Sequence, residues 1–235
     1  MLKAGFILLA VLLAAVLYIG AGIVTGKAFT RVSEEKQFKT KAVVVILVWL
    51  IYISVLSVKG IFAIATFPPR IPLLLVLPPF LFFAYLFTNR SFKKIIQNTP
   101  ASWPVYFQSF RIIVELLLLG LATQNMLPKM ATFEGYNYDI VIGITALLMG
   151  FFIRDTRFSQ RLLLGWNIAG LCTLAIVAFI LIGHSYFYTL FGQNESIVGK
   201  GFGLFPYTFL AGFFMPIAVF MHIFSIVQTR AAMKL

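Results

Sequence analysis

The sequence predicts an all-α membrane protein: a single transmembrane domain, residues 1–235, built as a bundle of seven helices. Apolar residues make up 61% of the chain and charged residues only 11%, so too few charges remain to coat a soluble domain. The mean hydropathy is +0.98. Seven apolar stretches are long enough to cross a hydrocarbon core of ~30 Å, and basic residues gather in alternate connectors.

The predicted spans follow one another with connectors too short to fold alone. They cover residues 4–25, 42–66, 71–88, 104–124, 138–154, 161–184 and 205–229. The first span follows Lys3, as a signal peptide would, but its apolar run is too long and Val24-Thr25-Gly26-Lys27 is no convincing cleavage site. We therefore expect a transmembrane helix there. The connector 89–103 contains Lys93 and Lys94 among apolar residues, which indicates a cytoplasmic segment at the membrane interface.

The basic residues predict the orientation of the bundle. Thirteen lie in the first, third and fifth connectors and the C-terminal tail, against five on the other side. The positive-inside rule then places the N-terminus outside and the C-terminus in the cytoplasm. The net charge of +12 is explained by this orientation, so no nucleic acid partner is expected. The thirteen are Lys27, Arg31, Lys36, Lys39, Lys41, Arg90, Lys93, Lys94, Arg154, Arg157, Arg161, Arg230 and Lys234.

An internal repeat is one interpretation of the span order. Spans one to three and five to seven would share an orientation, with the fourth as a linker, a parallel 3+1+3 arrangement known among small transporters. Trp49 and Trp166 lie early in the second helix of each triplet, and Pro78-Pro79 and Pro216 interrupt the third. Independent local kinks would explain the same prolines, so both interpretations stay open.

The fourth span carries the strongest candidate site. Arg111 and Glu115 are spaced i, i+4 and share a helix face. Each costs at least ~2.5 kcal/mol near the centre of a membrane helix, so neither should face lipid. At 1.5 Å per residue, Arg111 lies at the depth of Asn167 in the sixth span and His222 in the seventh. We expect these four side chains to form a buried polar cluster, which either binds an anion, relays protons or joins helices.

A second group of polar residues precedes the fifth span on the outer side. Asn137 and Asp139 are placed to cap that helix, because a side-chain oxygen there accepts unpaired N–H groups. Capping does not require Glu134, which with Asp139 and Glu195 would form an acidic outer mouth for a cation. No metal site is expected, since acids at these spacings define no loop for a hard ion.

Neither a catalytic constellation nor a cofactor is expected. The sequence lacks a nucleophile elbow, a Walker loop and paired cysteines, its single cysteine being Cys172. His184 lies near the outer end of the sixth span, so it cannot share a haem iron with His222, and the last span has no lysine for a retinal Schiff base. His222 is left to gate a proton path, to ligate a haem or metal alone, or to hydrogen-bond a neighbouring helix.

Three motifs mark the second half of the chain: M-x-T-F-E-G-x-N-x-D-I over residues 130–140, W-N-x-x-G-L over 166–171, and a last span with Pro216 and His222. With Arg111 and Glu115 they resemble a family of uncharacterised bacterial seven-helix membrane proteins, over about residues 104–235. The chain departs from that pattern at Tyr136, where arginine is usual, and at 208–210, where a Trp-Leu-Pro run is usual. The resemblance implies the topology and a multi-pass place in the bacterial inner membrane, with no activity attached.

Several functions fit these features. A small-solute or proton-coupled permease is the first expectation, and it needs the polar cluster and the acidic mouth on one water-accessible path. A non-catalytic accessory, assembly or sensor protein of a membrane complex would use the same residues to join helices. The expected partners are the lipid bilayer, then a small solute or protons, or another membrane protein. A wet path past Glu115 would favour transport, and a dry bundle with an exposed apolar groove would favour a partner protein.

Overall fold

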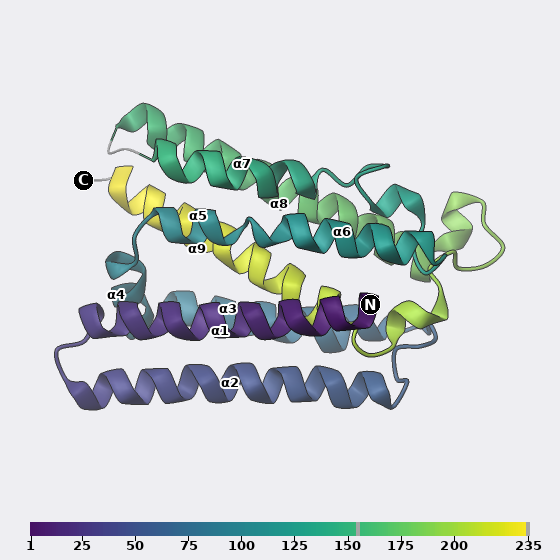
Figure 1. Cartoon of the computed structure of the whole chain (residues 1–235), viewed down its shortest axis with the longest axis horizontal. Helices are drawn as coiled ribbons and strands as arrows, with labels where there is room; N and C mark the ends of the chain where they lie inside the picture. The colour runs from purple at the N-terminus through teal and green to yellow at the C-terminus, as the bar shows by residue number, and fades with distance from the viewer. Residues whose placement is uncertain (154–155, 234–235) are drawn as a thin grey trace.

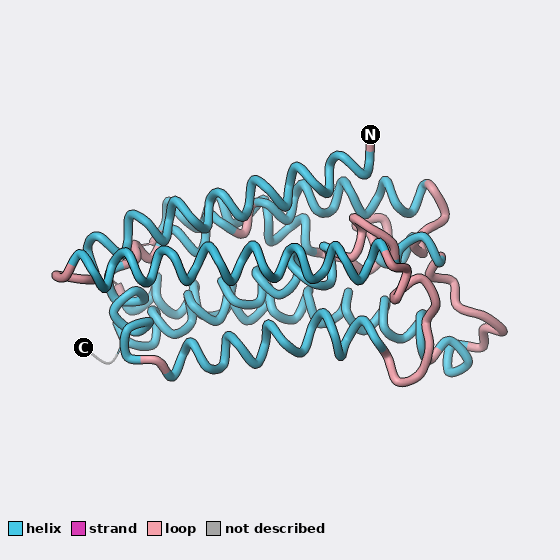
Figure 2. The backbone as a smooth tube through the Cα atoms, turned by 90° about the horizontal axis from the view of Figure 1, so that it is seen from below, coloured by secondary structure: helices cyan, strands magenta, loops and turns pink. Residues whose placement is uncertain are grey.

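The computed structural model describes residues 1–153 and 156–233, and it is helical without any strand over those residues. The predicted all-α class is confirmed. Figure 1 shows the long helices lying side by side, with the α1–α2 pair at one edge of the bundle and α7–α8 at the other. Most loops lie at the two ends of the bundle (Figure 2). Arg154 and Lys234, which the sequence analysis counted among the basic residues of the fifth connector and the tail, lie outside the described residues.

The described helices and turns follow one another along the whole chain. The α-helices are α1 (Leu2–Ala28), α2 (Val32–Val58), α3 (Leu77–Thr88), α4 (Arg90–Asn98), α5 (Ser102–Phe107), α6 (Phe110–Thr123), α7 (Asp139–Phe152), α8 (Arg157–Tyr186) and α9 (Met215–Met233). Two π-turns, η1 (Pro72–Val76) and η5 (Leu210–Phe214), lead into α3 and α9. The remaining turns are 3₁₀: η2 (Lys129–Ala131), η3 (Tyr188–Phe191) and η4 (Lys200–Gly203).

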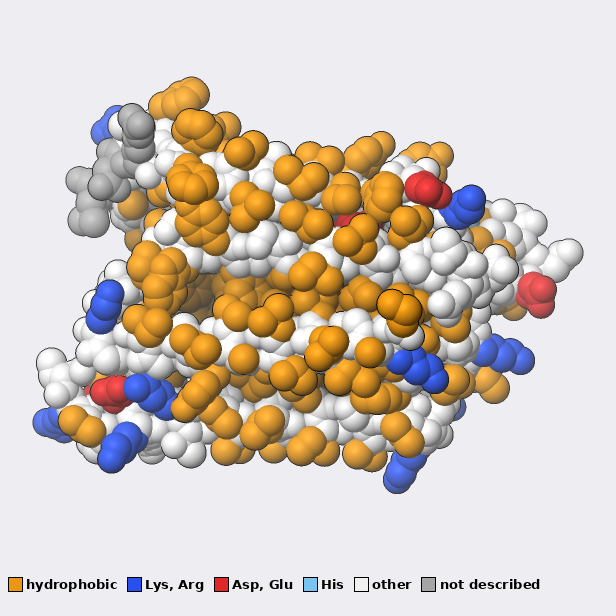
Figure 3. All heavy atoms as spheres, in the orientation of Figure 1, with side chains coloured by type: hydrophobic (Ala, Val, Ile, Leu, Met, Phe, Trp, Pro, Cys, Tyr) orange, Lys and Arg blue, Asp and Glu red, His pale blue; other side chains and the backbone are white. Residues whose placement is uncertain are grey.

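Several of these helices are long and apolar enough to cross a membrane. Among the described residues there are 5, or up to 6 if α3 and α4, which meet at 85°, form one broken span. The 5 are Leu2–Ala28, Val32–Val58, Ser102–Thr123, Arg157–Tyr186 and Leu210–Met233. The predicted span 138–154 corresponds to α7, whose 14 residues reach about 21 Å at 1.5 Å per residue. Apolar side chains cover the middle of the molecule and charged ones lie toward its two ends (Figure 3).

The second helix differs most from its predicted bounds of 42–66. It begins ten residues earlier, at Val32, where Glu35 and Lys39 form an i, i+4 ion pair that stabilises an exposed helical turn. It ends at Val58, because Gly60 takes a φ of 70° and donates to the Ser57 carbonyl at 3.0 Å. This left-handed glycine closes a Schellman-type C-cap that a helix running to residue 66 would have to break.

The connector 89–103 also differs, because most of it is helical. Asn89 accepts hydrogen bonds from the backbone N–H groups of Ser91 and Phe92 and so starts α4. At the other end, the Gln228 amide donates to the carbonyls of Ile96 and Thr99 at 2.8 and 2.7 Å. The apolar face of α4 is therefore buried in the bundle instead of lying only on the membrane surface.

Prolines explain the two π-turns. Pro216 has no N–H, so the carbonyl of Gly212 loses its α-helical donor, and the Trp49 indole N–H of α2 donates to it at 2.7 Å. The hydrogen bonding before the proline widens to i+5, from the Met215 N–H to the Leu210 carbonyl. The same widening precedes Pro78, and the last predicted span accordingly becomes regular helix only after this turn, not at residue 205.

Candidate functional site

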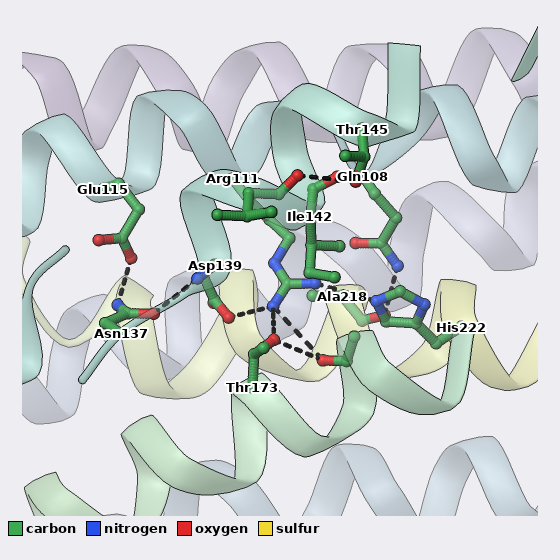
Figure 4. A network of polar contacts seen from close by, with 12 residues as sticks. Gln108, Arg111, Glu115, Asn137, Asp139, Ile142, Thr145, Thr173, Ala218 and His222 are labelled. Carbon is green, nitrogen blue, oxygen red and sulfur yellow. Dashed lines mark hydrogen bonds and ion pairs between the residues drawn. The ribbon is translucent and has the colours of Figure 1, made fainter. Parts of the chain in front are cut away.

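A set of polar side chains, most of them joined by hydrogen bonds, lies in the centre of the bundle between α6, α7, α8 and α9 (Figure 4). All of them except Thr173 are at most 6% exposed. We call this set the polar network; it comprises Gln108, Arg111, Glu115, Asn137, Asp139, Asn167, Thr173, His222 and Ser225.

Arg111 is the centre of the polar network. It lies in the first turn of α6, just after the helix is interrupted at Gln108 and Ser109. Its guanidinium group forms an ion pair with Asp139 of α7 and donates to the hydroxyl of Thr173 at 2.7 Å. The pairing with a carboxylate offsets the cost of burying a charge that is only 1% exposed. Its Nε has no hydrogen-bond partner among the described residues.

Glu115 lies one helical turn further along α6 and reaches a different partner. Its carboxylate accepts a hydrogen bond from the side-chain amide of Asn137. The Asn137 Oδ1 in turn accepts the backbone N–H of Asp139 at 3.0 Å, as Figure 4 shows. The i, i+4 spacing therefore places Arg111 and Glu115 on one face, but the ion pair of Arg111 is made with α7.

His222 connects Arg111 to α8. Its Nε2 lies 3.0 Å from Nη1 of Arg111, and its Nδ1 lies 2.9 Å from Oδ1 of Asn167. A guanidinium group can only donate, so Nε2 is the acceptor and Nδ1 carries the proton given to Asn167. The Asn167 amide then donates to Ser225 at 2.9 Å. Both imidazole nitrogens are occupied, which leaves none for a metal or a haem iron.

The structure brings together six of the seven residues that the sequence singled out. Arg111, Asn167 and His222 are joined directly, and Glu115 is joined through Asn137. Asp139 belongs to the same network and not to a separate outer site. Glu134 lies outside it and is exposed.

Two sequence expectations for the outer segment need correction. The acidic mouth is not formed, because Asp139 is buried against Arg111 while Glu134 and Glu195 remain exposed. The cap of α7 is only partly as expected: Asn137 accepts one N–H at the helix start, whereas the Asp139 carboxylate is directed to Arg111. The Asp139 carboxylate stabilises the protein more by pairing with a buried guanidinium group than by accepting a capping hydrogen bond at the start of α7.

Sequence reasoning missed Gln108, Thr173 and Ser225 as members of the network. Gln108 is fully buried and its amide donates to the Ala218 carbonyl at 2.9 Å. Gln108 and Ser225 each lie three residues from a residue that was found, Arg111 and His222 respectively. Because residues three apart share a helix face, scanning for polar residues at this spacing would have identified them.

A cavity of about 80 Å³ adjoins the ion pair. Arg111 and Asp139 are its charged lining residues, and the rest of its wall comes mainly from apolar side chains of η1, η5, α6 and α8. Ser185 and Tyr186, at the end of α8, line it as well. No group of three His, Cys, Asp or Glu side chains that could hold a metal ion occurs in residues 1–153 and 156–233.

The polar network lies within the part of the chain that matches a known protein family. The model of a domain of unknown function, DUF8737, matches residues 68–230, which is more than half of the chain. The match starts just before η1, ends in α9 and includes every residue of the polar network. The comparisons with curated proteins and with solved structures gave no match. The chain therefore belongs to the DUF8737 family.

Proposed function

We propose that this chain is a seven-span, multi-pass protein of the bacterial inner membrane with its N-terminus outside and its C-terminus in the cytoplasm. The positive-inside distribution of lysines and arginines supports the orientation. In this topology α3 and α4 form one broken span and α7 a short one. A short span is accommodated by local thinning of the bilayer. The resemblance of residues 104–235 to bacterial seven-helix proteins supports the location.

Within that membrane we propose a small-solute or proton-coupled permease whose solute site is the cavity beside Arg111 and Asp139. The observation that carries the proposal is the position of this cavity between the π-turns η1 and η5, against a buried ion pair. Transporters commonly bind their substrates where irregular helices meet, and π-turns often accompany functional sites. An ion pair at such a depth is costly and commonly lies on a transport path.

The two π-turns also support the parallel 3+1+3 repeat. In both halves a Phe-Pro pair, at Pro68 and at Pro206, comes four residues before the turn begins. A further proline follows ten residues after each pair, at Pro78 and at Pro216. One shared pattern is a simpler account than two independent kinks. In parallel repeats of this kind the solute site lies between equivalent helices, where this cavity is found.

The chemistry of the cavity indicates the class of solute. Its wall is aliphatic and aromatic apart from the ion pair and the residues near Tyr186, so a solute with a short apolar body fits. An anionic group on that solute would compete with Asp139 for Arg111, whose Nε is unpaired. Protonation of Asp139 would release Arg111 in the same way. Solute binding and proton transfer would thereby be coupled at this ion pair, to which Glu115, joined through Asn137 to the start of α7, would relay protons.

Flux through proteoliposomes tests the permease. Vesicles containing an internal pH-sensitive dye are energised with a potassium diffusion potential and exposed to a panel of small organic anions. We expect protein-dependent proton flux that Ala178→Leu reduces at least tenfold, because Ala178 lines the cavity. Ala175→Leu is the matched control, since Ala175 is exposed on the same helix and does not line the cavity. Equal flux in the two variants would contradict the proposed site.

A second candidate is an accessory or assembly protein that uses the network only to join helices. It is favoured by the burial of Glu115, which is 0% exposed and does not line the cavity. Glu115→Gln separates the two functions. A permease that relays protons through Glu115 loses proton flux with little change in melting temperature in detergent. A purely structural network shows no wild-type flux for any solute, and the variant changes only the melting temperature.

A further inference from the structure

A large groove opens between the α1–α2 hairpin and the neighbouring helices, beyond the place where Phe6 of α1 packs against Tyr207 and Phe214. Its volume is about 1250 Å³, and it lies between α1 and α2 on one side and α3, α4, α5 and α9 on the other. Figure 3 shows it as a hollow between apolar side chains, at the level between α1 and α5 in the orientation of Figure 1. This volume exceeds the roughly 300–1,000 Å³ of typical small-molecule pockets. The groove is therefore suited to a ligand of lipid size.

The lining of the groove is strongly asymmetric. Along α1 it extends from Leu12 to Phe29, which is about 25 Å at 1.5 Å per residue. Over most of this length its walls are aliphatic and aromatic. Glu34 and Gln37 of α2 line the end nearest Phe29, and Lys41 lines the groove further along, about level with Gly20, because the preceding turn places Lys39 beside Gly22. Asn89 and Ser91, at the start of α4, line it too.

The polar part of the groove carries an unpaired lysine, Lys41, and one acid, Glu34, whose charge is balanced by Arg31 at 3.9 Å. Lys41 is exposed and takes part in no ion pair within the described chain, unlike Lys39, which is paired with Glu35. The Nζ of Lys94 lies 6.0 Å from the ring centroid of Phe29, itself a lining residue. These lysines belong to the side of the bundle that carries most of the basic residues. An anionic group at this end of the groove would be attracted to them.

We propose that the groove binds an anionic phospholipid, with its phosphate group near Lys41 and its acyl chains along α1 and α5. From the level of Lys41, near Gly20, to Leu12 the groove extends about 12 Å along α1 at 1.5 Å per residue. Half of a ~30 Å hydrocarbon core is about 15 Å, so this stretch accommodates most of an acyl chain. In the orientation proposed above, this lipid comes from the cytoplasmic leaflet, whose anionic lipids attract lysine and arginine. Phe110 lines both the groove and the cavity beside Arg111, but Lys41 lines only the groove and the Arg111–Asp139 ion pair lines only the cavity.

Native mass spectrometry of the delipidated full chain tests this assignment. Dioleoyl phosphatidylglycerol and dioleoyl phosphatidylcholine serve as probes that differ only in the headgroup. We expect tighter binding of phosphatidylglycerol, and a loss of about fivefold in that binding in Lys41→Gln. Lys36→Gln is the matched control, since Lys36 is exposed on the same helix but does not line the groove.

A second pair of variants tests the acyl-chain part of the site. Val16→Trp places a bulky ring in the groove, whereas Val11→Trp changes an equally lipid-facing position of α1 outside it. We expect only Val16→Trp to remove both lipids. Equal binding of the two lipids by the wild type, or equal effects of Lys41→Gln and Lys36→Gln, would overturn the proposal. So would a Val16→Trp variant that keeps its lipids but changes from dimer to monomer, which would assign the groove to a second copy of the chain.

Discussion

The N-terminal hairpin is more apolar than the helices at the centre of the bundle, yet less of it is buried inside the protein. Of the most apolar window of each helix, 22% is buried in α1 and 11% in α2, against 56% in Ser102–Thr123 and 56% in Leu210–Met233. The DUF8737 match begins at residue 68, after the hairpin. Hydrophobicity therefore makes these helices suited to cross a membrane, but it does not explain which of them lie at the centre of the bundle.

Polar groups account for the difference. Lipid is as apolar as a leucine side chain, so an apolar helix face gains little from moving out of lipid onto another helix. A buried charge or amide must find a partner. α6 and α9 carry Arg111, Glu115 and His222, whose partners come from α7 and α8 or the segment before α7. The hairpin contacts η5 and the residues before it through hydrogen bonds of Trp49 and Ser57.

The largest loss of stability is expected from a substitution at Arg111, the centre of the polar network. Arg111→Leu leaves Asp139 as an unpaired buried carboxylate, and we expect a loss of stability of ~3–5 kcal/mol. Thermal unfolding in detergent, followed by circular dichroism, measures it. The double variant Arg111→Leu with Asp139→Asn removes both charges and should recover much of the loss. If the double variant is as unstable as the single one, the ion pair does not explain why these helices lie at the centre of the bundle.

A smaller effect is expected at Gly170 of α8. A Cβ atom there would contact the His222 ring, so Gly170→Ala should push the imidazole away from Arg111 and Asn167. We expect a cost of ~1–3 kcal/mol, the range for overpacking. Gly165→Ala is the control on the same helix, because a Cβ atom at Gly165 meets nothing within 4 Å, and it should be neutral or stabilising. Similar melting temperatures for the two variants would show that this close approach is unimportant.

The attachment of the hairpin is tested at Trp49. Trp49→Phe keeps the ring but leaves the Gly212 carbonyl without its donor, and we expect a cost of ~1 kcal/mol. Trp103→Phe is the control, since the Trp103 indole makes no hydrogen bond within the described chain. Proteolysis of the loop between α1 and α2 in detergent gives a second measurement, and it should accelerate only in Trp49→Phe. Loss of stability in both variants would point to ring packing instead.

The smallest loss of stability is expected from shortening an isoleucine of α2, and two isoleucines of this helix can be compared. Ile53 is 0% exposed and contacts η5 near Gly212, whereas Ile51 is 61% exposed. Ile53→Val should cost ~0.5 kcal/mol through lost packing, and Ile51→Val should change nothing measurable. Melting temperatures of both variants, measured in one detergent, sharpen the comparison between the two regions. A larger effect at Ile51 would mean that the exposed face of the hairpin is covered by a partner.

Part of the polar site could be predicted, because the free-energy cost of exposing a polar side chain to lipid can be estimated from the sequence alone. Arg111, Glu115, Asn167 and His222 were each identified as too costly to face lipid, and helical rise placed three of them at one depth. The ion pair between Arg111 and Asp139 could not be predicted in this way. Asp139 was assigned to an outer mouth because it begins a helix after a polar loop, and nothing local indicates that α7 packs with its first turn beside Arg111.

The sequence by itself determined that this chain is helical, with several helices long and apolar enough to cross a membrane, and it identified most of the polar residues that lie inside. These properties follow from transfer free energies of single residues, summed over a window. Only the tertiary structure decided that the inner cluster and the outer group form one network, that two prolines produce matching π-turns, and that a groove opens beside the hairpin. Those features depend on which helix faces which, and packing in lipid is set by a few hydrogen bonds and close contacts between residues far apart in the chain.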